Sequence, residues 1–285
     1  MRAKIYYRGS LTSCNYDCPY CPFSKNKDSL ETLAKDRAQL EAFVLWVREQ
    51  GAEGTRLSIF FNPYGEGLTH RWYREAMAEL SHMEHVEKVA IQTNLSAKLD
   101  WIDGLHAGKA AFWVTYHPGQ VACDKFLRQC MTLYEKGIAF SVGSVGLKSA
   151  TDSLKELRGK LPQDVYMWVN AYKDQPDYYT EADAAVLQEI DPHFQINAMD
   201  YDSKGKACNA GYDVFYVLGD GRVKRCYKDR QVIGNLYREG LHAISKKRPC
   251  RMACCDCYIG YIHMPELKLE EVYGESILER IAVKR

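Results

Sequence analysis

The sequence predicts an α/β fold in which a parallel β-sheet is covered by helices on its outer side. Strand-like and helix-like segments alternate from residue 4 to about residue 190. Near residue 200 this alternation stops, and two apolar runs joined by Gly-Asp-Gly predict a β-hairpin. The alternating part contains six strand–helix units, two fewer than a closed eight-unit barrel.

Each element of the alternating part has its own local signal. Runs rich in β-branched and aromatic residues predict strands at residues 4–8, 56–61, 86–93, 110–116, 138–142 and 165–170. Apolar residues at helical spacing predict helices at residues 29–50, 70–81, 120–136, 152–160 and 181–189. Ser29 is a suitable N-cap for the first of these helices because its hydroxyl can accept a backbone N–H.

The C-terminal part differs in character from the alternating part. Residues 212–218 and 222–227 are the predicted arms of the hairpin, and residues 272–283 have the pattern of a final short helix. The change of pattern predicts two domains, residues 1–199 with the strand–helix units and residues 200–285 with the hairpin and helix.

The charge balance argues against some classes of partner. The chain has 38 Lys and Arg against 37 Asp and Glu, a net charge of +1. Nucleic-acid and membrane-surface binding usually need a clustered basic excess, so we expect neither partner. No apolar run approaches the roughly 20 residues that cross a bilayer, and residues 1–10 lack the apolar region of a signal peptide. We therefore expect a soluble, cytoplasmic protein.

Eleven cysteines are many for a cytosolic protein, and their odd number favours metal ligation over a disulfide framework. Nine of them form two groups, one near each end of the sequence. Cys123 and Cys130 are the exceptions. They lie seven residues apart on a predicted helix, so we expect both in the hydrophobic core.

The first group, Cys14, Cys18 and Cys21, has the spacing C-x3-C-x2-C and directly follows the first predicted strand. Three thiolates on one loop can bind three irons of a 4Fe–4S cube and leave the fourth iron without a protein ligand. Structural zinc usually takes four protein ligands, and no fourth Cys or His lies nearby in the sequence. The spacing therefore favours an iron–sulfur cluster with one open iron.

Together with Tyr20, the aromatic residue before the third cysteine, this loop resembles the signature of the radical SAM superfamily. The resemblance implies a partial (β/α)6 barrel, open on one side, that carries the cluster at the carboxyl ends of its strands. It also implies that S-adenosylmethionine binds the open iron close to Tyr20. One electron from a flavodoxin- or ferredoxin-type reductant then cleaves this cofactor into methionine and a 5′-deoxyadenosyl radical.

Two further segments resemble cofactor-binding positions of the superfamily. Gly65 and Glu66 match the end of its Gly-Gly-Glu motif, whose first glycine is replaced here by Tyr64. The motif implies contact with the amino group of S-adenosylmethionine, which needs hydrogen-bond acceptors on a backbone that passes close to it. Thr93 and Asn94 match a Thr-Asn pair near the ribose or carboxylate of the cofactor. A helix N-cap is an equally good interpretation of this pair.

Three residues at later strand ends complete the candidate site. Ser141 resembles a serine that contacts the cofactor in relatives. His117 follows the fourth predicted strand and places a titratable group at the barrel mouth, although a His before Pro is more often structural. Asn170 ends the sixth predicted strand. We predict His117 and Asn170 as catalytic residues and Ser141 as a cofactor contact.

The second cysteine group begins at the predicted hairpin. Cys208, Gly221 and Cys226 form the pattern C-x12-G-x4-C, and the segment Ile233-Gly234-Asn235 follows it. This arrangement resembles the SPASM module of radical SAM enzymes in its shortened form, the Twitch module. The resemblance implies a second, auxiliary 4Fe–4S cluster in the C-terminal part.

The expected ligands of this auxiliary cluster are four cysteines, namely Cys208, Cys226, Cys254 and Cys257. Cys250 and Cys255 compete for the same role, and spacing does not separate them from the predicted set. Four thiolates at such spacing could also bind zinc, so a structural zinc site stays open as an alternative.

The predicted function is hydrogen abstraction from a small-molecule or short-peptide substrate by a radical SAM enzyme, with the auxiliary cluster aiding oxidation or electron transfer. The triad begins by residue 14, so we expect no leader-recognition domain before it. An alternative is carbon–sulfur or carbon–carbon crosslinking of a ribosomal peptide with a separate leader-binding partner. A non-catalytic scaffold that binds iron–sulfur or zinc is an alternative of another class. A scaffold would not need the methionine-binding segments 65–66 and 93–94.

Overall fold

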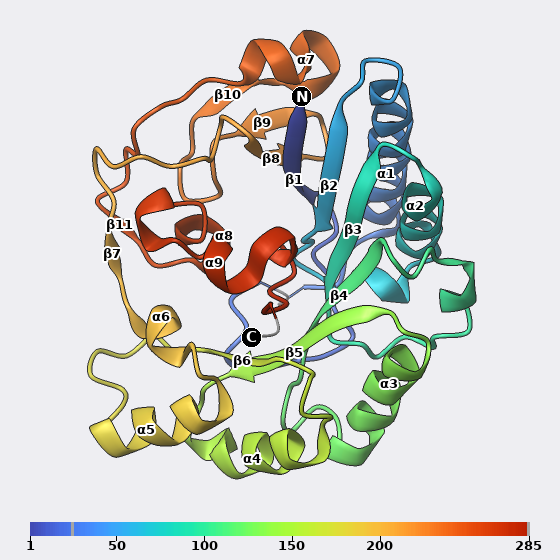
Figure 1. Cartoon of the computed structure of the whole chain (residues 1–285). Helices are drawn as coiled ribbons and strands as arrows, with labels where there is room; N and C mark the ends of the chain where they lie inside the picture. Colours follow the sequence, from blue (N-terminus) through green and yellow to red (C-terminus); the bar gives the residue numbers. More distant parts are fainter. Residues whose placement is uncertain (24–25, 284–285) are drawn as a thin grey trace.

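The computed structural model describes residues 1–23 and 26–283 and contains a nine-stranded sheet within them. Its strand order is β10-β9-β8-β1-β2-β3-β4-β5-β6, and the six strands β1–β6 run parallel (Figure 1). These are the six predicted strands, with bounds β1 Arg2–Arg8, β2 Arg56–Phe61, β3 Val86–Thr93, β4 Ala110–Thr115, β5 Ala139–Val145 and β6 Met167–Asn170. The predicted partial α/β barrel is confirmed.

The helices that connect these strands lie outside the sheet (Figure 1). They are α1 Leu30–Gln50, α2 Arg71–His82, α3 Cys123–Glu135, α4 Thr151–Lys160, α5 Glu181–Ile190 and α6 Phe194–Ala198. The hydroxyl of Ser29 accepts the backbone N–H of Thr32, so the predicted N-cap of α1 is confirmed. Within residues 1–23 and 26–283, no helix combines the length and apolar character needed to span a membrane.

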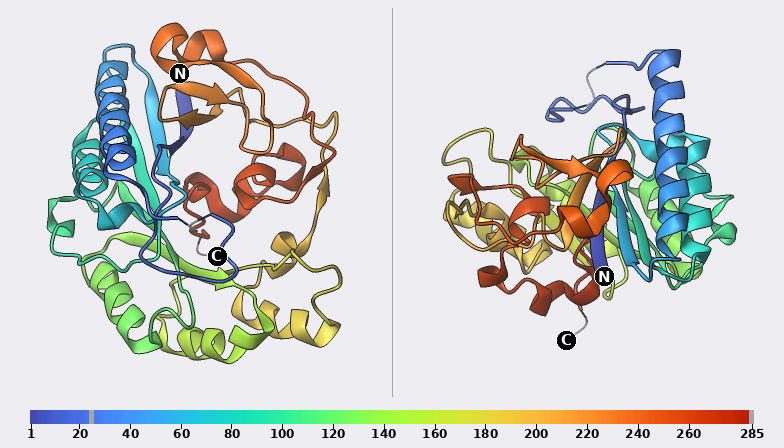
Figure 2. Two further views of the ribbon diagram at one scale, coloured as in Figure 1. Left: turned by 180° about the vertical axis from the view of Figure 1, so that it is seen from behind. Right: turned by 90° about the horizontal axis from the view of Figure 1, so that it is seen from above.

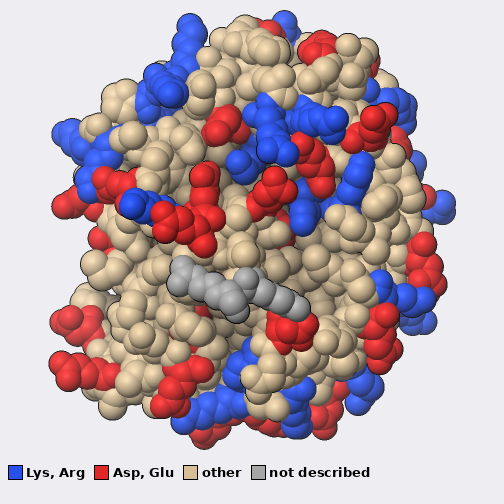
Figure 3. Space-filling model, viewed as in Figure 1, with Lys and Arg blue, Asp and Glu red and all other residues tan. Residues whose placement is uncertain are grey.

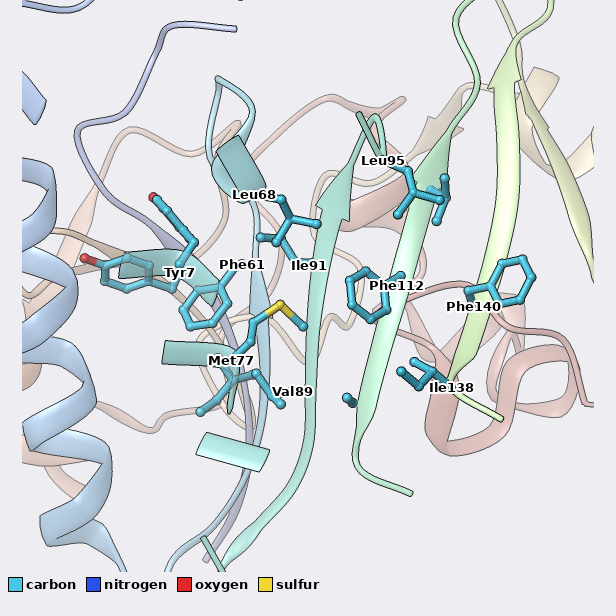
Figure 4. Packing of buried hydrophobic residues seen from close by; sticks show 14 of the residues in the cluster. Tyr7, Phe61, Leu68, Met77, Val89, Ile91, Leu95, Phe112, Ile138 and Phe140 are labelled. Atoms are coloured by element: carbon cyan, nitrogen blue, oxygen red, sulfur yellow. The ribbon is translucent and has the colours of Figure 1, made fainter. Parts of the chain in front are cut away.

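The outer face of the sheet packs against the helices because successive side chains of a strand point to opposite faces. Figure 4 shows this layer, in which Tyr7 and Phe61 from neighbouring strands meet Met77 of α2, with Ile91 and Phe112 further along the sheet. The surface of the molecule carries acidic and basic side chains interspersed over the face in Figure 3, in keeping with the small net charge.

The inner face of the sheet packs against the C-terminal segment. Tyr6, Phe60, Trp113 and Trp168 point to this side and share one buried cluster with residues 258–278. That segment contains α8 Tyr258–Tyr261 and α9 Glu270–Tyr273, which lie inside the ring of strands in Figures 1 and 2. In a closed barrel, side chains from all strands fill the interior and bury the inner face of the sheet. This barrel is open, so the C-terminal segment covers the apolar inner face in its place.

The predicted hairpin forms and continues the barrel sheet. Its strands are β8 Val214–Leu218, β9 Arg222–Lys224 and β10 Val232–Asn235, followed by α7 Leu236–Ile244. β8 pairs in parallel with β1, so one sheet extends across the predicted boundary at residue 199. A second, two-stranded sheet joins β7 Tyr201–Asp202 to β11 Cys254–Cys255.

The predicted final helix over residues 272–283 is wrong. α9 ends at Tyr273, a 3-10 turn spans Gly274–Ser276, and Gly274 and Arg280 have φ values of 53° and 60°. An α-helix needs negative φ at every position, so the chain leaves the helical path at both residues. This irregular path buries Glu279 and Arg280 completely.

Candidate functional site

A cavity of about 250 Å³ lies where the parallel strands end. Every one of the six barrel strands contributes a residue at or directly after its carboxyl end, namely Arg8, Asn62, Thr93, Thr115, Val145 and Asn170. Cys14, Cys18 and Cys21 line the same cavity. Active sites of α/β barrels lie at this end of the sheet, because the loops after the strands converge there.

The triad loop is held in place by two aspartates at the start of α1. Asp28 accepts hydrogen bonds from the backbone N–H of Thr12 and Ser13, at 2.7 and 2.8 Å. Asp36 is fully buried and accepts the backbone N–H of Leu11 at 2.8 Å. These bonds fix the backbone just before the first cysteine, so the loop is tied to the outer helix and not only to its own strand.

The loop after β2 approaches the triad loop at Gly65. A Cβ atom at this position would lie 1.9 Å from the backbone oxygen of Ser13, far inside van der Waals contact. The next residue, Glu66, donates its backbone N–H to the same oxygen at 3.1 Å. The predicted Gly-Glu pair therefore has a structural reason for its glycine, because only a residue without a side chain allows this approach.

The carboxylate of Glu66 is buried and accepts three hydrogen bonds from the loops after β2 and β3. It accepts the backbone N–H of Leu68 at 3.0 Å, the hydroxyl of Thr93 at 2.8 Å and the backbone N–H of Asn94 at 2.6 Å. Burial raises the pKa of Glu66, and these three donors oppose that rise. Glu66 therefore joins the loops after β2 and β3 into one rigid wall of the cavity.

The thiols of the triad have surroundings that suit cluster ligation. The Cys14 sulfur accepts the backbone N–H of Tyr16 at 3.4 Å and the side-chain amide of Asn94 at 3.6 Å. Hydrogen bonds to the ligating sulfurs are a feature of iron–sulfur sites. Among the described residues, no three His, Cys, Asp or Glu side chains are close enough to hold a single metal ion. In a cube each cysteine binds its own iron, so cluster ligation does not need three side chains that converge on a single ion.

His117 lies between two residues of the triad loop. Its Nδ1 is 2.8 Å from the hydroxyl of Tyr20 and 3.4 Å from the sulfur of Cys18. Burial lowers the pKa of His117 to about 4, so the ring is neutral at pH 7. The structure thus brings together two separately predicted residues, Tyr20 and His117, in the wall of the cavity.

Most predicted site residues of the barrel line this cavity, namely Tyr20, Gly65, Glu66, Thr93, Asn94, His117 and Asn170. Ser141 does not line it. Its hydroxyl donates to the backbone oxygen of Glu279 at 2.8 Å and accepts from the indole of Trp168 at 3.2 Å. In the structure Ser141 binds the C-terminal segment inside the barrel.

Sequence reasoning missed two buried arginines near the cavity. Arg8 ends β1 and lines the cavity directly. Arg280 comes from the C-terminal segment and donates from Nη1 to the side-chain oxygen of Asn170 at 2.6 Å. Alternation along β1 could have indicated Arg8, since it shares a face with Tyr6. Arg280 lies 110 positions from Asn170, and no local signal connects them.

A second cavity, of about 30 Å³, lies in the C-terminal part. Six cysteines line it, namely Cys208, Cys226, Cys250, Cys254, Cys255 and Cys257. The structure thus brings together the four predicted ligands and the two competing cysteines, although they span 50 positions of sequence.

Cys254 and Cys255 differ in enclosure. Cys254 is exposed and pairs with Asp202 in the small sheet, whereas Cys255 is half-buried. Burial raises the pKa of the Cys255 thiol, and the nearby thiols of Cys226 and Cys257 raise it further. The enclosed side chain is the better placed of the two to join the other cysteines.

Two cations line the cysteine-rich cavity. Arg225 is 3% exposed and donates to the backbone oxygens of Ala210, at 3.1 Å, and of Arg248 and Pro249. Lys228 forms an ion pair with Asp256 at 2.7 Å. Arg225 therefore fixes the backbone directly before Cys250 and places positive charge where several thiols meet.

No protein-family model matches the chain, and no curated protein matches it. Solved structures do match. Streptococcus suis SuiB bound to S-adenosylmethionine has a TM-score of 0.57 at 16% identity, over 84% of this chain and 64% of SuiB. The chain thus spans less than two thirds of SuiB.

A second similar structure is anSMEcpe with bound AdoMet and the Cp18Cys peptide. Its TM-score is 0.55 at 14% identity, over 86% of this chain and 80% of anSMEcpe. The structure of anSMEcpe with bound AdoMet alone has a TM-score of 0.54 at 14% identity, over 85% of this chain and 80% of that one. At such identities the similarity establishes the fold alone, and this fold is the partial α/β barrel that the sequence predicts.

Proposed function

We propose that this chain is a radical SAM enzyme that abstracts a hydrogen atom from an organic substrate. The observation that carries the proposal is one cavity, at the carboxyl ends of the barrel strands, that unites the cysteine triad with the segments 65–66 and 93–94. A reduced 4Fe–4S cluster on Cys14, Cys18 and Cys21 would supply the electron that cleaves S-adenosylmethionine to a 5′-deoxyadenosyl radical.

The chain's own residues bind and orient the cofactor in this proposal. Glu66 stabilises its loop through three donors, and backbone oxygens of this loop would accept from the cofactor's ammonium group. Asn94 holds the Cys14 sulfur and the loop after β3 together, which aligns cluster and cofactor.

His117 and Asn170 face the cavity from the fourth and sixth strands and would orient the substrate. His117 is neutral at pH 7 because burial lowers its pKa to about 4, so it can hold the triad loop through Tyr20 without adding charge. Arg280 fixes the amide of Asn170 by donating to its oxygen, which leaves the amide N–H groups to donate to a ligand.

The C-terminal part, residues 200–285, is proposed to bind one auxiliary 4Fe–4S cluster, as a module that is built onto the barrel sheet. The gathering of six cysteines around one small cavity supports it. Cys208, Cys226 and Cys257 would be ligands, with Cys254 or the more enclosed Cys255 as the fourth. Such a cluster would accept an electron from the substrate or relay one through the protein.

The substrate is proposed to be a small molecule or a short peptide. The similar structure of anSMEcpe contains the Cp18Cys peptide, which favours a peptide. Crosslinking of a ribosomal peptide with a separate leader-binding partner is the second candidate of this kind. The electron donor would be a flavodoxin- or ferredoxin-type protein of the cytoplasm, because cluster chemistry needs a reducing compartment.

The test is formation of 5′-deoxyadenosine from S-adenosylmethionine by the anaerobically reconstituted protein under dithionite. Wild type should form it, and the variant Cys14→Ala/Cys18→Ala/Cys21→Ala should not. Cys123→Ala is the matched control, since this cysteine lies in α3 outside both cysteine groups. A cluster-loaded wild type that forms none above the cluster-free protein would be a scaffold and would disprove the proposal.

A further inference from the structure

Arg8 is a buried cation in the wall of the barrel cavity. It ends β1 and is 8% exposed. Its Nε donates to the backbone oxygen of Asn62 at 2.8 Å, and its Nη2 donates to the side-chain oxygen of the same residue. Asn62 in turn donates to the side chain of Gln92. The guanidinium is therefore held in one orientation by the loop after β2.

Both faces of this guanidinium are covered by aromatic rings. Its carbon lies 4.0 Å from the ring centre of Tyr64 and 3.6 Å from that of Tyr227. Tyr64 belongs to the barrel, and Tyr227 follows Cys226 in the C-terminal part. A guanidinium has five N–H donors in its plane, and the oxygens of Asn62 take two. The plane between the rings is therefore the direction in which Arg8 can bind a further acceptor.

Arg8 forms no ion pair with an Asp or Glu of residues 1–23 and 26–283. Glu66, the carboxylate that lines the same cavity, is bonded to Leu68, Thr93 and Asn94 instead. Burying a charge without a partner costs free energy, so buried cations are normally paired. By contrast, the buried Glu279 is paired with Lys88 at 3.1 Å.

We infer that Arg8 is the binding site for a carboxylate group of the organic substrate. The rigid planar fork of arginine matches the two oxygens of a carboxylate, and burial in the cavity wall strengthens such a bond. The inference rests on the proposed function and narrows its substrate to a carboxylate-bearing molecule, such as a peptide with an acidic side chain or a free C-terminus.

Two other sources of negative charge lie near Arg8. Arg8 does not line the cysteine-rich cavity, but while burial raises the pKa of the Cys257 thiol there, the charge of Arg8 lowers it, beside the larger contribution of Lys228. The methionyl carboxylate of S-adenosylmethionine is the other carboxylate available. Its amino group is expected at Gly65 and Glu66, in the same loop after β2 that holds Arg8, so this carboxylate competes directly with that of the substrate. The experiment separates these two carboxylates.

The experiment measures equilibrium binding to the anaerobically reconstituted holoenzyme. The probes are short peptides as free acids and as matched C-terminal amides, and S-adenosylmethionine with its decarboxylated analogue. For at least one peptide, wild type should bind the acid about tenfold or more tightly than the amide, as a charge-assisted bond gives. Arg8→Gln should bring this ratio close to one and leave the affinity for S-adenosylmethionine unchanged, and Arg8→Lys should give an intermediate ratio.

Arg158→Gln is the matched control. Arg158 also donates to backbone oxygens, those of Leu161, Pro162 and Val165, but it lies in α4 away from both cavities. This control should keep the wild-type ratio. If only the discrimination between S-adenosylmethionine and its decarboxylated analogue depends on Arg8, the arginine binds the cofactor and the substrate assignment is overturned.

The inference is overturned if Arg8→Gln keeps the wild-type ratio of affinities for acid and amide peptides. It is also overturned if wild type distinguishes neither the acid from the amide nor S-adenosylmethionine from its decarboxylated analogue. Binding needs no turnover, so these outcomes are independent of 5′-deoxyadenosine formation. If the holoenzyme cleaves S-adenosylmethionine but does not prefer acid peptides, only the carboxylate site is disproved. If it prefers acid peptides but cleaves no S-adenosylmethionine, only the proposed reaction is disproved.

Discussion

The N-terminal triad and the C-terminal cysteine group differ in how much space they surround. Three cysteines of the triad face a cavity of about 250 Å³ that also reaches Arg8 and Asn170. The six C-terminal cysteines line a cavity of only about 30 Å³. The cavity at the triad therefore offers much more free space for a further ligand than the cavity at the C-terminal cysteines.

The two groups also differ in what holds them. Hydrogen bonds from the triad loop to Asp28 and Asp36 and the close approach at Gly65 attach the triad to the barrel. The C-terminal group is arranged around Arg225, a buried cation. The comparison teaches that a larger cavity and a smaller one can be built on one continuous sheet, the first at the strand ends and the second beside an added hairpin.

The largest expected effect is on iron content. Wild type should bind about eight irons per chain and the triple variant Cys14→Ala/Cys18→Ala/Cys21→Ala about four, as two separate 4Fe–4S sites require. Cys208→Ala/Cys226→Ala should also leave about four irons, but should spare the triad. Iron and acid-labile sulfide analysis measures both. One zinc per chain in place of the second set of irons would contradict an auxiliary cluster.

A second comparison lies within the C-terminal group. Cys255→Ser should lose the metal of this site, because Cys255 is half-buried among the other thiols, whereas Cys254→Ser should keep it, because Cys254 is exposed. Absorbance and iron content of the two reconstituted variants decide between them. The opposite result would restore Cys254 as the fourth ligand.

Gly65→Ala tests the attachment of the triad to the barrel. The added Cβ would meet the backbone oxygen of Ser13 at 1.9 Å, so the two loops must separate. We expect a loss of about 2 kcal/mol in the free energy of unfolding, typical of overpacking, and weaker binding of S-adenosylmethionine. Denaturant titration and equilibrium dialysis measure these. Gly104→Ala is the control, since nothing lies within 4 Å of its Cβ, and equal behaviour of the two variants would refute this role of Gly65.

The smallest expected effect concerns pH and the segment that follows the C-terminal cysteines. His263 is buried, its Nε2 is 3.0 Å from the hydroxyl of Tyr6, and burial lowers its pKa to about 3. The unfolded chain, with a histidine pKa of about 6.5, binds more protons between these two values. Stability therefore falls as the pH decreases below about 6.5, by about 1 kcal/mol from pH 7 to pH 5.5 for this group.

The variant His263→Gln isolates this contribution, because glutamine can still hydrogen-bond to Tyr6 but does not titrate in this range. Its free energy of unfolding should fall less than that of wild type between pH 7 and pH 5.5. Denaturant titrations at the two pH values measure the difference. Identical pH dependence in both proteins would mean that His263 titrates in the folded state with the same pKa as in the unfolded chain.

Much of the barrel was predictable from local patterns. The six strands and the helices around them follow from apolar periodicity, and the cap at Ser29 follows from its hydroxyl. The carboxyl ends of parallel strands meet at one edge, so the clustering of the triad with Glu66, Thr93 and Asn94 was predictable as well. These features depend on residues that are close in sequence or fixed by strand direction.

Other features depend on contacts between distant segments, which periodicity does not encode. The predicted helix over residues 272–283 failed because the chain there turns to fill the concave side of the sheet, with Arg280 reaching Asn170. The Tyr64–Arg8–Tyr227 stack joins three segments far apart in sequence. Spacing and residue type define the chemistry that each segment can offer, and packing across the barrel determines which of these groups share a cavity.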